Sequence, residues 1–154
     1  MSEGIDNLLF ASEVTVKELR AVLFDLDDTL YPESQFVLGG FRAVAIWGEK
    51  SFGLPEETSY HRLQKMFDDG IRERTFDLWL GEMNLATREH ISMAVRVYRD
   101  HDPSIRPYPD VLPLLEHLRK RYLLGVVTDG DWRAQRRKID ALGISEFFEI
   151  EILT

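Results

Sequence analysis

Residues 21–30 read AVLFDLDDTL, in which four apolar residues run directly into a cluster of carboxylates. A short apolar run of this kind is typical of a strand buried in a parallel sheet, whose ligands bind at the carboxyl ends of the strands. Side chains alternate along an extended chain, so Asp25 and Asp27 project to the same side while Leu26 points back into the protein. This stretch therefore predicts a strand that delivers two carboxylates to a binding site.

A second apolar run, LLGVV at residues 123–127, ends in Thr128, Asp129 and Gly130. A strand-end hydroxyl followed by a glycine-containing turn offers backbone N–H groups at the start of a helix, which suits a bound phosphate. An Asp-x-Asp sequence by itself is common by chance, because Asp often ends strands and caps helices. The second run favours a functional interpretation, since it brings anion-binding donors to the same edge of the sheet as the carboxylates.

The segments around these two runs alternate between helical and extended patterns. Apolar residues recur at helical spacing from Val111 to Leu118, and residues 131–142 form a second helical stretch that Gly143 would end. Residues 147–153 then alternate like a third strand. The order strand, helix, strand, helix, strand predicts the α/β class, with a Rossmann-like, three-layer parallel sheet core.

The connection between the first strand and the helix that should follow it, residues 31–106, is far longer than a loop. Apolar residues recur at helical spacing within it, at 60–67 and again at 91–98. Its large aromatic residues are expected to pack inside it rather than to contact a ligand. These residues are Trp47, Phe67, Phe76, Trp79 and Tyr98. We therefore predict an inserted helical cap at 31–106, and an α/β core made of residues 1–30 and 107–154.

The composition narrows the class of protein. The 154 residues carry a net charge of −8 and no cysteine. The negative net charge argues against a nucleic-acid-binding protein, which needs a clustered basic face. The absence of cysteine excludes disulfides, thiolate catalysis and cysteine-ligated zinc. No apolar run approaches the roughly 20 residues of a membrane span, and residues 1–6 lack the pattern of a signal peptide. We therefore expect a cytoplasmic protein with no nucleic-acid or membrane partner.

The two carboxylates of the first motif also suggest a cofactor. On one side of a strand they repel each other, which favours either a shared proton or a cation between them. Magnesium prefers carboxylate and phosphate oxygens, whereas the four histidines show no spacing typical of a zinc site. Asp25 and Asp27 are therefore interpreted as a magnesium site.

At these motifs the sequence resembles the haloacid dehalogenase-like (HAD) superfamily, in its phosphatase branch with a helical cap inserted after the first strand. Residues 25–30 (DLDDTL) match the family's first motif, and residues 127–130 (VTDG) match its second. Residues 108–111 (YPDV), before the second motif, are also typical of the capped branch. The resemblance implies a magnesium-dependent hydrolase of small phosphate monoesters, with a small phosphorylated metabolite chosen by the cap.

The resemblance further implies a role for each matching residue. Asp25 would be the nucleophile that becomes an aspartyl phosphate, and Asp27 would act as acid and then as base. The Asp25 carboxylate and the backbone carbonyl of Asp27 would bind Mg²⁺, and Thr29 would brace the nucleophile loop. The phosphoryl oxygens would be held by the Thr128 hydroxyl and the N–H groups of Asp129 and Gly130.

Alternatives to a phosphatase stay open at this point. The acid at position 27 favours phosphate ester hydrolysis over dehalogenation, with a phosphomutase as the near alternative. An interpretation from another class is a catalytically incomplete protein that binds phosphate or magnesium and acts through partners. A dinucleotide-binding domain is the remotest choice, because no G-x-G-x-x-G sequence follows the first strand.

The family places a lysine and a later acidic metal ligand after the third strand, whereas this sequence ends at Thr154. We therefore expect a C-terminally truncated chain with an incomplete core, and weak or absent hydrolysis by this chain alone. Lys138 is interpreted as a surface residue of the helix after the second motif rather than as a replacement for the missing lysine. The first strand is expected to keep an unpaired edge, through which the chain self-associates.

Overall fold

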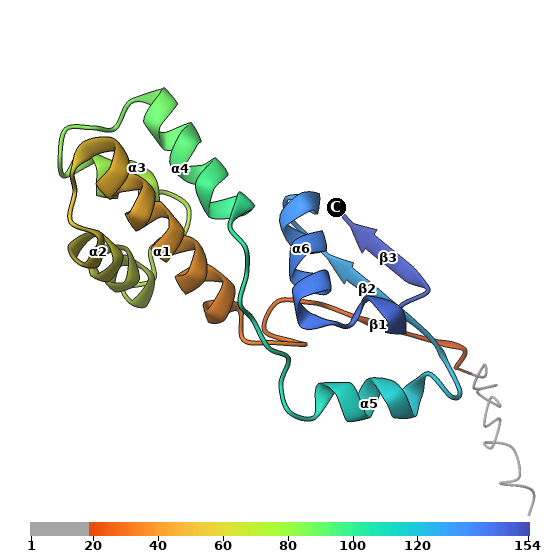
Figure 1. Cartoon of the computed structure of the whole chain (residues 1–154). Helices are drawn as coiled ribbons and strands as arrows, with labels where there is room; N and C mark the ends of the chain where they lie inside the picture. Colours follow the sequence, from red (N-terminus) through yellow and green to blue (C-terminus); the bar gives the residue numbers. More distant parts are fainter. Residues whose placement is uncertain (1–18) are drawn as a thin grey trace, which may run out of the picture.

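The computed structural model describes residues 19–154, which form a small parallel sheet with its own helices and a separate group of four helices (Figure 1). Three strands, β1 (Ala21–Phe24), β2 (Leu123–Thr128) and β3 (Ile150–Leu153), lie side by side in the order β1-β2-β3. Both strand pairs are parallel. The predicted α/β class with a parallel sheet is confirmed.

One face of the sheet is covered by the two helices that connect its strands, α5 (Val111–Leu118) and α6 (Trp132–Leu142). Leu124 and Val126 of β2 point to this face and are fully buried in the hydrophobic core between the sheet, α5 and α6, which is called the main core below. The apolar face of each connecting helix packs against them, because burial of that face is what stabilises a helix of only two to three turns. The sheet and these two helices thus share a single core.

The opposite face of the sheet carries apolar side chains that remain exposed within residues 19–154. The register places Leu23, Gly125 and Ile150 side by side on this face. Exposed fractions there reach 56% for Leu23 and 42% for Ile152. Among the described strands β1 pairs only with β2, so its other edge is open, as the sequence predicted.

The third strand is shorter than the alternating pattern predicted. It begins at Ile150, and the preceding residues Ser145–Phe147 form a 3₁₀ turn, η1. Phe147 donates its backbone N–H to Ile144 and buries its ring in the main core. The alternation of apolar and polar residues therefore continues past the end of the strand. Phe147 of the turn is buried in the core, as an apolar strand residue would be.

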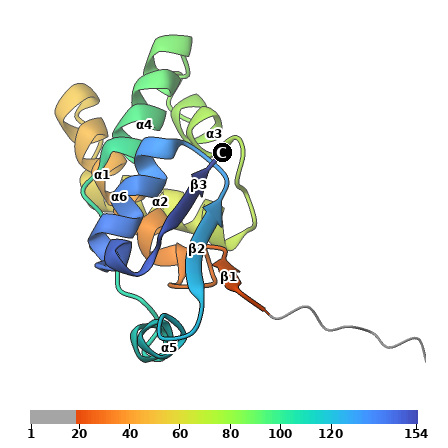
Figure 2. The same ribbon diagram turned by 90° about the vertical axis from the view of Figure 1, so that its right-hand side faces the viewer.

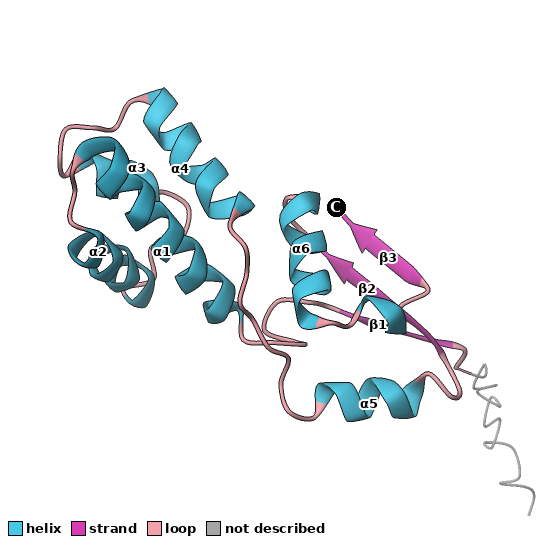
Figure 3. Ribbon diagram, in the orientation of Figure 1, coloured by secondary structure: helices cyan, strands magenta, loops and turns pink. Residues whose placement is uncertain are grey.

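The long insertion is helical, as predicted, and has a core of its own (Figures 1 and 3). It contains α1 (Glu33–Phe52), α2 (Glu56–Asp68), α3 (Thr75–Gly81) and α4 (Arg88–Asp100). Of the aromatic residues expected inside it, Phe76 and Trp79 are buried and the others are partly buried against the same core. Local signals set the ends of its helices: the Thr87 hydroxyl caps α4 by accepting from His90 N–H at 3.1 Å, and Gly53 ends α1 at φ +72°.

The helical group lies beyond the carboxyl ends of the strands (Figures 1 and 2). The two chain segments that join it to the sheet are bonded to each other. Gln35 accepts from the Arg106 N–H at 2.8 Å, and Tyr108 N–H donates to the Leu30 carbonyl at 3.0 Å. A further contact joins α6 to the end of α4, where Arg137 donates to the Asp100 carbonyl at 2.6 Å. These bonds hold the helical group over the strand ends.

None of the helices in residues 19–154 combines the length and apolar character that crossing a membrane would require.

Candidate active site

The first motif forms a tight loop at the end of β1. Backbone N–H groups of Thr29 and Leu30 both donate to the Leu26 carbonyl, at 3.3 and 3.0 Å. Leu26 is fully buried, as expected for the residue between the two carboxylates. Asp28 takes a left-handed conformation at φ +54°, and its carboxylate accepts from the Glu33 N–H at 2.8 Å, which joins the loop to the first turn of α1.

Asp25 stands at the end of β1 with its side chain exposed. The Thr29 hydroxyl donates to one of its carboxylate oxygens at 3.4 Å. An exposed carboxylate with one oriented oxygen is available to an incoming substrate.

Asp27 has a different environment, because its side chain points toward α6 and is surrounded by donors. Lys138 Nζ lies 2.8 Å from both carboxylate oxygens, the Tyr31 hydroxyl donates to Oδ1, and the Gln135 amide donates to Oδ2 at 3.2 Å. Burial by itself raises the pKa of Asp27, but the hydrogen bonds from Lys138, Tyr31 and Gln135 together with the charge of Lys138 outweigh it and hold the pKa below its ordinary value. Asp27 is therefore an ionised carboxylate held in one orientation.

The interpretation of Lys138 as a surface residue is wrong. The residue is only 5% exposed, and its ammonium group lies between Asp27 and the ring of Phe36, whose centroid is 4.4 Å away. Lys138 sits on the buried face of α6 with Ala134, Gln135 and Ile139. A polar residue in a helix usually faces solvent, whereas Lys138 is buried against a carboxylate. The i, i+3 spacing of Gln135 and Lys138 within an otherwise apolar face was the available signal.

The second motif lies beside the first. Thr128 ends β2 and is buried, and the Gln135 amide donates both to its hydroxyl oxygen and to the Asp129 carbonyl, at 2.5 and 2.9 Å. Because Gln135 also contacts Asp27, one side chain joins the two motifs. The Thr128 hydroxyl keeps its own proton available for a phosphoryl oxygen, since it accepts from Gln135.

The turn after Thr128 is only partly arranged as expected. Gly130 takes φ +125°, and the Asp131 carboxylate caps α6 by accepting from two of its first N–H groups at 3.1 Å. The Gly130 N–H, however, donates to the Thr154 carbonyl at 2.7 Å, and the Asp129 carboxylate accepts from the Thr154 hydroxyl at 2.5 Å. The predicted phosphate donor at Gly130 is therefore engaged within the chain in this structure.

The fit of a magnesium ion can be judged from the oxygen donors near the motifs. Within residues 19–154 no group of three or more His, Asp or Glu side chains is gathered as it would be in an all-protein metal site. Magnesium usually needs only one or two carboxylates, with waters and substrate phosphate completing its octahedron. The exposed Asp25 carboxylate suits such a site, whereas the Asp27 side chain is occupied by Lys138.

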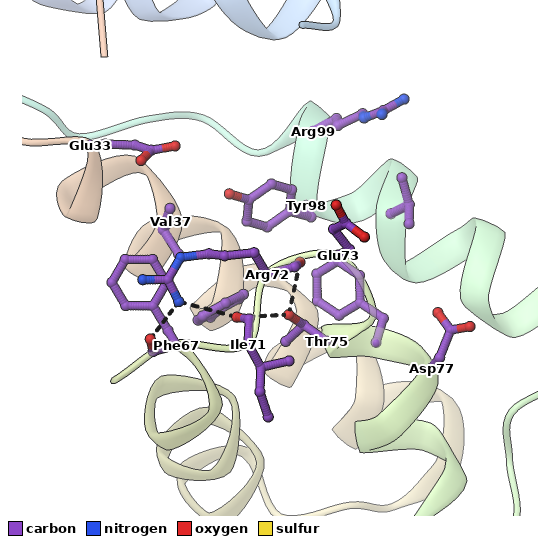
Figure 4. A pocket seen from close by; sticks show the side chains of 13 residues that line it. Glu33, Val37, Phe67, Ile71, Arg72, Glu73, Thr75, Asp77, Tyr98 and Arg99 are labelled. Atoms are coloured by element: carbon purple, nitrogen blue, oxygen red, sulfur yellow. Dashed lines mark hydrogen bonds between the residues drawn. The ribbon is translucent and has the colours of Figure 1, made fainter. Parts of the chain in front are cut away.

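A cavity of about 310 Å³ opens in the helical group (Figure 4). Its walls include Phe41, Phe67 and Phe76, three of the aromatic side chains in the core of the helical group. Glu33 and Arg99 also line it and connect it to the core, since the Glu33 N–H binds the Asp28 carboxylate and Arg99 pairs with Asp131 at 3.5 Å. Burial and the neighbouring charge of Asp27 raise the pKa of Glu33. The cavity therefore has both apolar and charged walls, and two of its charged residues, Glu33 and Arg99, connect it to the core.

Comparison with known proteins gives one consistent family. The model of the haloacid dehalogenase-like hydrolase family matches residues 19–154. Glyceraldehyde 3-phosphate phosphatase of Methanopyrus kandleri is 36% identical over 146 residues, which cover 88% of this chain and 62% of the relative. The enzyme of the same name from Methanothermobacter thermautotrophicus is 30% identical over 143 residues, with the same two coverages. The chain thus spans 62% of the length of these curated relatives.

Solved structures agree with this fold. A HAD hydrolase from Bacillus subtilis, described as bound to magnesium, gives a TM-score of 0.60 at 18% identity and covers 89% of this chain and 64% of its own. A HAD-superfamily hydrolase from Geobacter sulfurreducens gives 0.62 at 16% identity, covering 88% of this chain and 62% of its own. The Rossmann-like character predicted for the core is confirmed by these neighbours.

Proposed function

The chain belongs to the haloacid dehalogenase-like hydrolase family, and from this premise we propose that it carries the reacting groups of a phosphatase for small phosphate monoesters. One observation supports the proposal most: Gln135 joins the Asp27 carboxylate to the Thr128 hydroxyl, beside the exposed Asp25. An accessible carboxylate, a second fixed carboxylate and a phosphate-binding hydroxyl are the groups that phosphoryl transfer through an aspartate requires. The curated relatives are named phosphatases.

The proposed reaction has two half-reactions. In the first, a carboxylate oxygen of Asp25 bonds to phosphorus while the bond from phosphorus to the ester oxygen breaks, and Asp27 in its protonated form gives its proton to the departing alkoxide. In the second, Asp27 takes a proton from water, whose oxygen bonds to the phosphorus of the aspartyl phosphate and releases inorganic phosphate and free Asp25. The ionised Asp27 of this structure is the form that the second half-reaction needs.

A magnesium ion, when bound by Asp25 and the Asp27 carbonyl, would neutralise charge on the phosphate that approaches a carboxylate. The residues of the chain supply the remaining electrostatic support. Thr128 would donate its hydroxyl proton to a phosphoryl oxygen, and Thr29 would keep the nucleophilic carboxylate oriented. Catalysis by this site would therefore depend mainly on position and charge, as in other phosphoryl transfers.

We further propose that the substrate is a phosphorylated compound of about the size of a triose phosphate. The relatives named above act, by their names, on glyceraldehyde 3-phosphate. The 310 Å³ cavity is at the small end of the range for ligand pockets, roughly 300–1,000 Å³. A small organic group with hydroxyl or carbonyl oxygens suits a cavity whose walls are aromatic and whose inner end carries Glu33 and Arg99.

A second candidate function is phosphate or magnesium binding without turnover. It is favoured by the ion pair between Asp27 and Lys138, which lowers the pKa of Asp27 and so disfavours the protonated form that the first half-reaction needs. In this case the motifs would bind the anion and the ion, while the reaction itself would not proceed.

The test is hydrolysis of p-nitrophenyl phosphate and of glyceraldehyde 3-phosphate by the purified 154-residue chain, with magnesium and with a chelator. Asp25→Asn and Asp27→Asn are compared with Asp68→Asn, a matched change of an exposed aspartate at the end of α2. We expect weak turnover that requires magnesium and Asp25, and that falls roughly 10²-fold or more in Asp27→Asn. Asp68→Asn should retain full activity. Binding of inorganic phosphate without turnover would support the second candidate instead.

A further inference from the structure

Gln135 and Lys138 stand out because the helix that carries them does not need them for packing. They lie one turn apart on the buried face of α6 and are 3% and 5% exposed. Five polar or charged side chains are buried in the part of the chain that the structure describes, and Thr128, Gln135 and Lys138 are three of them. Buried polar groups thus concentrate at one point, between the two motifs.

The contacts of these two side chains are complementary. Lys138 binds both oxygens of Asp27 at 2.8 Å, which fixes the plane of the carboxylate as well as its position. The side-chain amide nitrogen of Gln135 lies within hydrogen-bonding distance of Asp27, the Thr128 hydroxyl and the Asp129 carbonyl. The acid and base of the proposed reaction and its phosphate-binding hydroxyl are therefore attached to the same turn of α6.

Stability does not account for this arrangement. Replacing a buried ion pair by well-packed apolar residues is often neutral or stabilising, because desolvation offsets the attraction between the charges. Leucine or methionine at positions 135 and 138 would continue the apolar face formed by Ala134, Ile139 and Leu142. The lysine and the glutamine at these positions are better explained by their hydrogen bonds to Asp27 and Thr128 than by the packing of the helix.

We infer that Gln135 and Lys138 are positioning residues, which clamp the Asp27 carboxyl next to Thr128 and leave Asp25 as the free carboxylate of the pair. The inference rests on the proposed function. The two aspartates of the first motif would otherwise be equivalent neighbours on one side of the strand. The clamp assigns them different tasks, since Asp27 is held by donors from α6 whereas Asp25 remains exposed and is contacted by Thr29. Neither Gln135 nor Lys138 needs to touch the substrate for this role.

The test compares two esters that differ in their need for a proton. The alkoxide that leaves glyceraldehyde 3-phosphate must be protonated by a well-placed acid, whereas p-nitrophenolate leaves with little need for protonation. We expect Lys138→Met to lower kcat for glyceraldehyde 3-phosphate by roughly 10²-fold, with a much smaller loss for p-nitrophenyl phosphate and little change in KM for either. Gln135→Leu should act in the same direction, and Lys138→Arg should restore part of the rate. Lys65→Met, which removes an exposed ion pair in α2, is the matched control.

The outcomes separate the inference from the proposed function. Equal losses on both esters, in an active wild-type chain, would overturn the positioning role and indicate a structural one. A wild-type chain that hydrolyses neither ester would refute the proposed function, and the positioning role with it. The clamp itself is also tested by a measurement that needs no activity. Lys138→Met leaves the half-buried Asp27 carboxylate without its cation, so adding Asp27→Asn should raise the melting temperature of the Lys138→Met variant by roughly 5 °C. No recovery in the double variant would show that the two groups are not paired.

Discussion

The network around Asp27 makes a quantitative prediction for Tyr31→Phe. Tyr31 is fully buried, and its hydroxyl donates to the Asp27 carboxylate. The change removes one oxygen and leaves the aromatic ring, so packing of the ring in the main core is retained. What is lost is a hydrogen bond to a charged group.

The magnitude follows from the surroundings of the carboxylate. A hydrogen bond to a charged group contributes about 1.5–3 kcal/mol, and the lower end applies here because Asp27 keeps Lys138 and Gln135 and its side chain is 24% exposed. We therefore expect Tyr31→Phe to lower the free energy of unfolding by about 1.5 kcal/mol at pH 7. With a urea m-value of about 2 kcal/mol/M, the midpoint of unfolding falls by about 0.8 M.

The assay is urea denaturation of wild type, Tyr31→Phe and Tyr122→Phe, followed by circular dichroism. Tyr122 is the matched control, since it packs against the same core and its hydroxyl makes no hydrogen bond within residues 19–154. Its loss should change stability by less than about 0.5 kcal/mol. If the two variants unfold at the same urea concentration, the Tyr31 hydroxyl does not support Asp27 and the reasoning is refuted.

Three further predictions concern stability and association. A methyl group on Gly40 would lie 2.4 Å from the Tyr98 ring, so Gly40→Ala should cost about 1–3 kcal/mol in thermal unfolding, whereas Gly81→Ala, in open space, should be neutral. The lowered pKa of Asp27 means that its charge stabilises the fold above pH about 4 and ceases to do so as pH falls through that lowered pKa; urea unfolding should therefore show a larger loss for Asp27→Asn at pH 7 than at pH 3. The exposed sheet face should drive association at high concentration, and sedimentation should show less of it in Ile152→Lys; unchanged association would exclude this face.

Much of the fold could be predicted because its elements carry regular local signals. The apolar runs before Asp25 and Thr128 are strands, since short apolar segments that end in polar residues have few other ways to be buried. The helical insertion was predictable from its length and periodicity. Its exact helix ends, and the shortened third strand, depend on turns such as Ser145–Phe147 whose residues also suit a strand.

The candidate site was only partly predictable. Asp25 directly follows β1 and Thr128 ends β2, as the two apolar runs predicted, while the chemical roles of these residues stay predictions. The clamp on Asp27 was not foreseen, because Lys138 and Gln135 are polar residues in a helix rich in charged residues, and pattern alone assigns such residues to solvent. Only the packing of α6 against β2 and the first motif shows that these two positions face inward.

The engagement of Gly130 could not be foreseen either. Its N–H donates to a carbonyl 24 residues further along the chain, and no local signal specifies a partner at that separation. Local patterns thus locate the motifs, whereas long-range contacts decide which of their donors are free.

The proposed reaction passes through a phosphorylated Asp25. The most direct measurement is mass spectrometry of the 154-residue chain, quenched in acid during reaction with p-nitrophenyl phosphate and magnesium, followed by peptide mapping. We expect a phosphoryl group on the peptide that contains residues 25–30, more of it in Asp27→Asn because hydrolysis of the intermediate is slowed, and none in Asp25→Asn. Release of phosphate by the wild-type chain with no phosphorylated peptide in either the wild type or Asp27→Asn would contradict the proposed reaction.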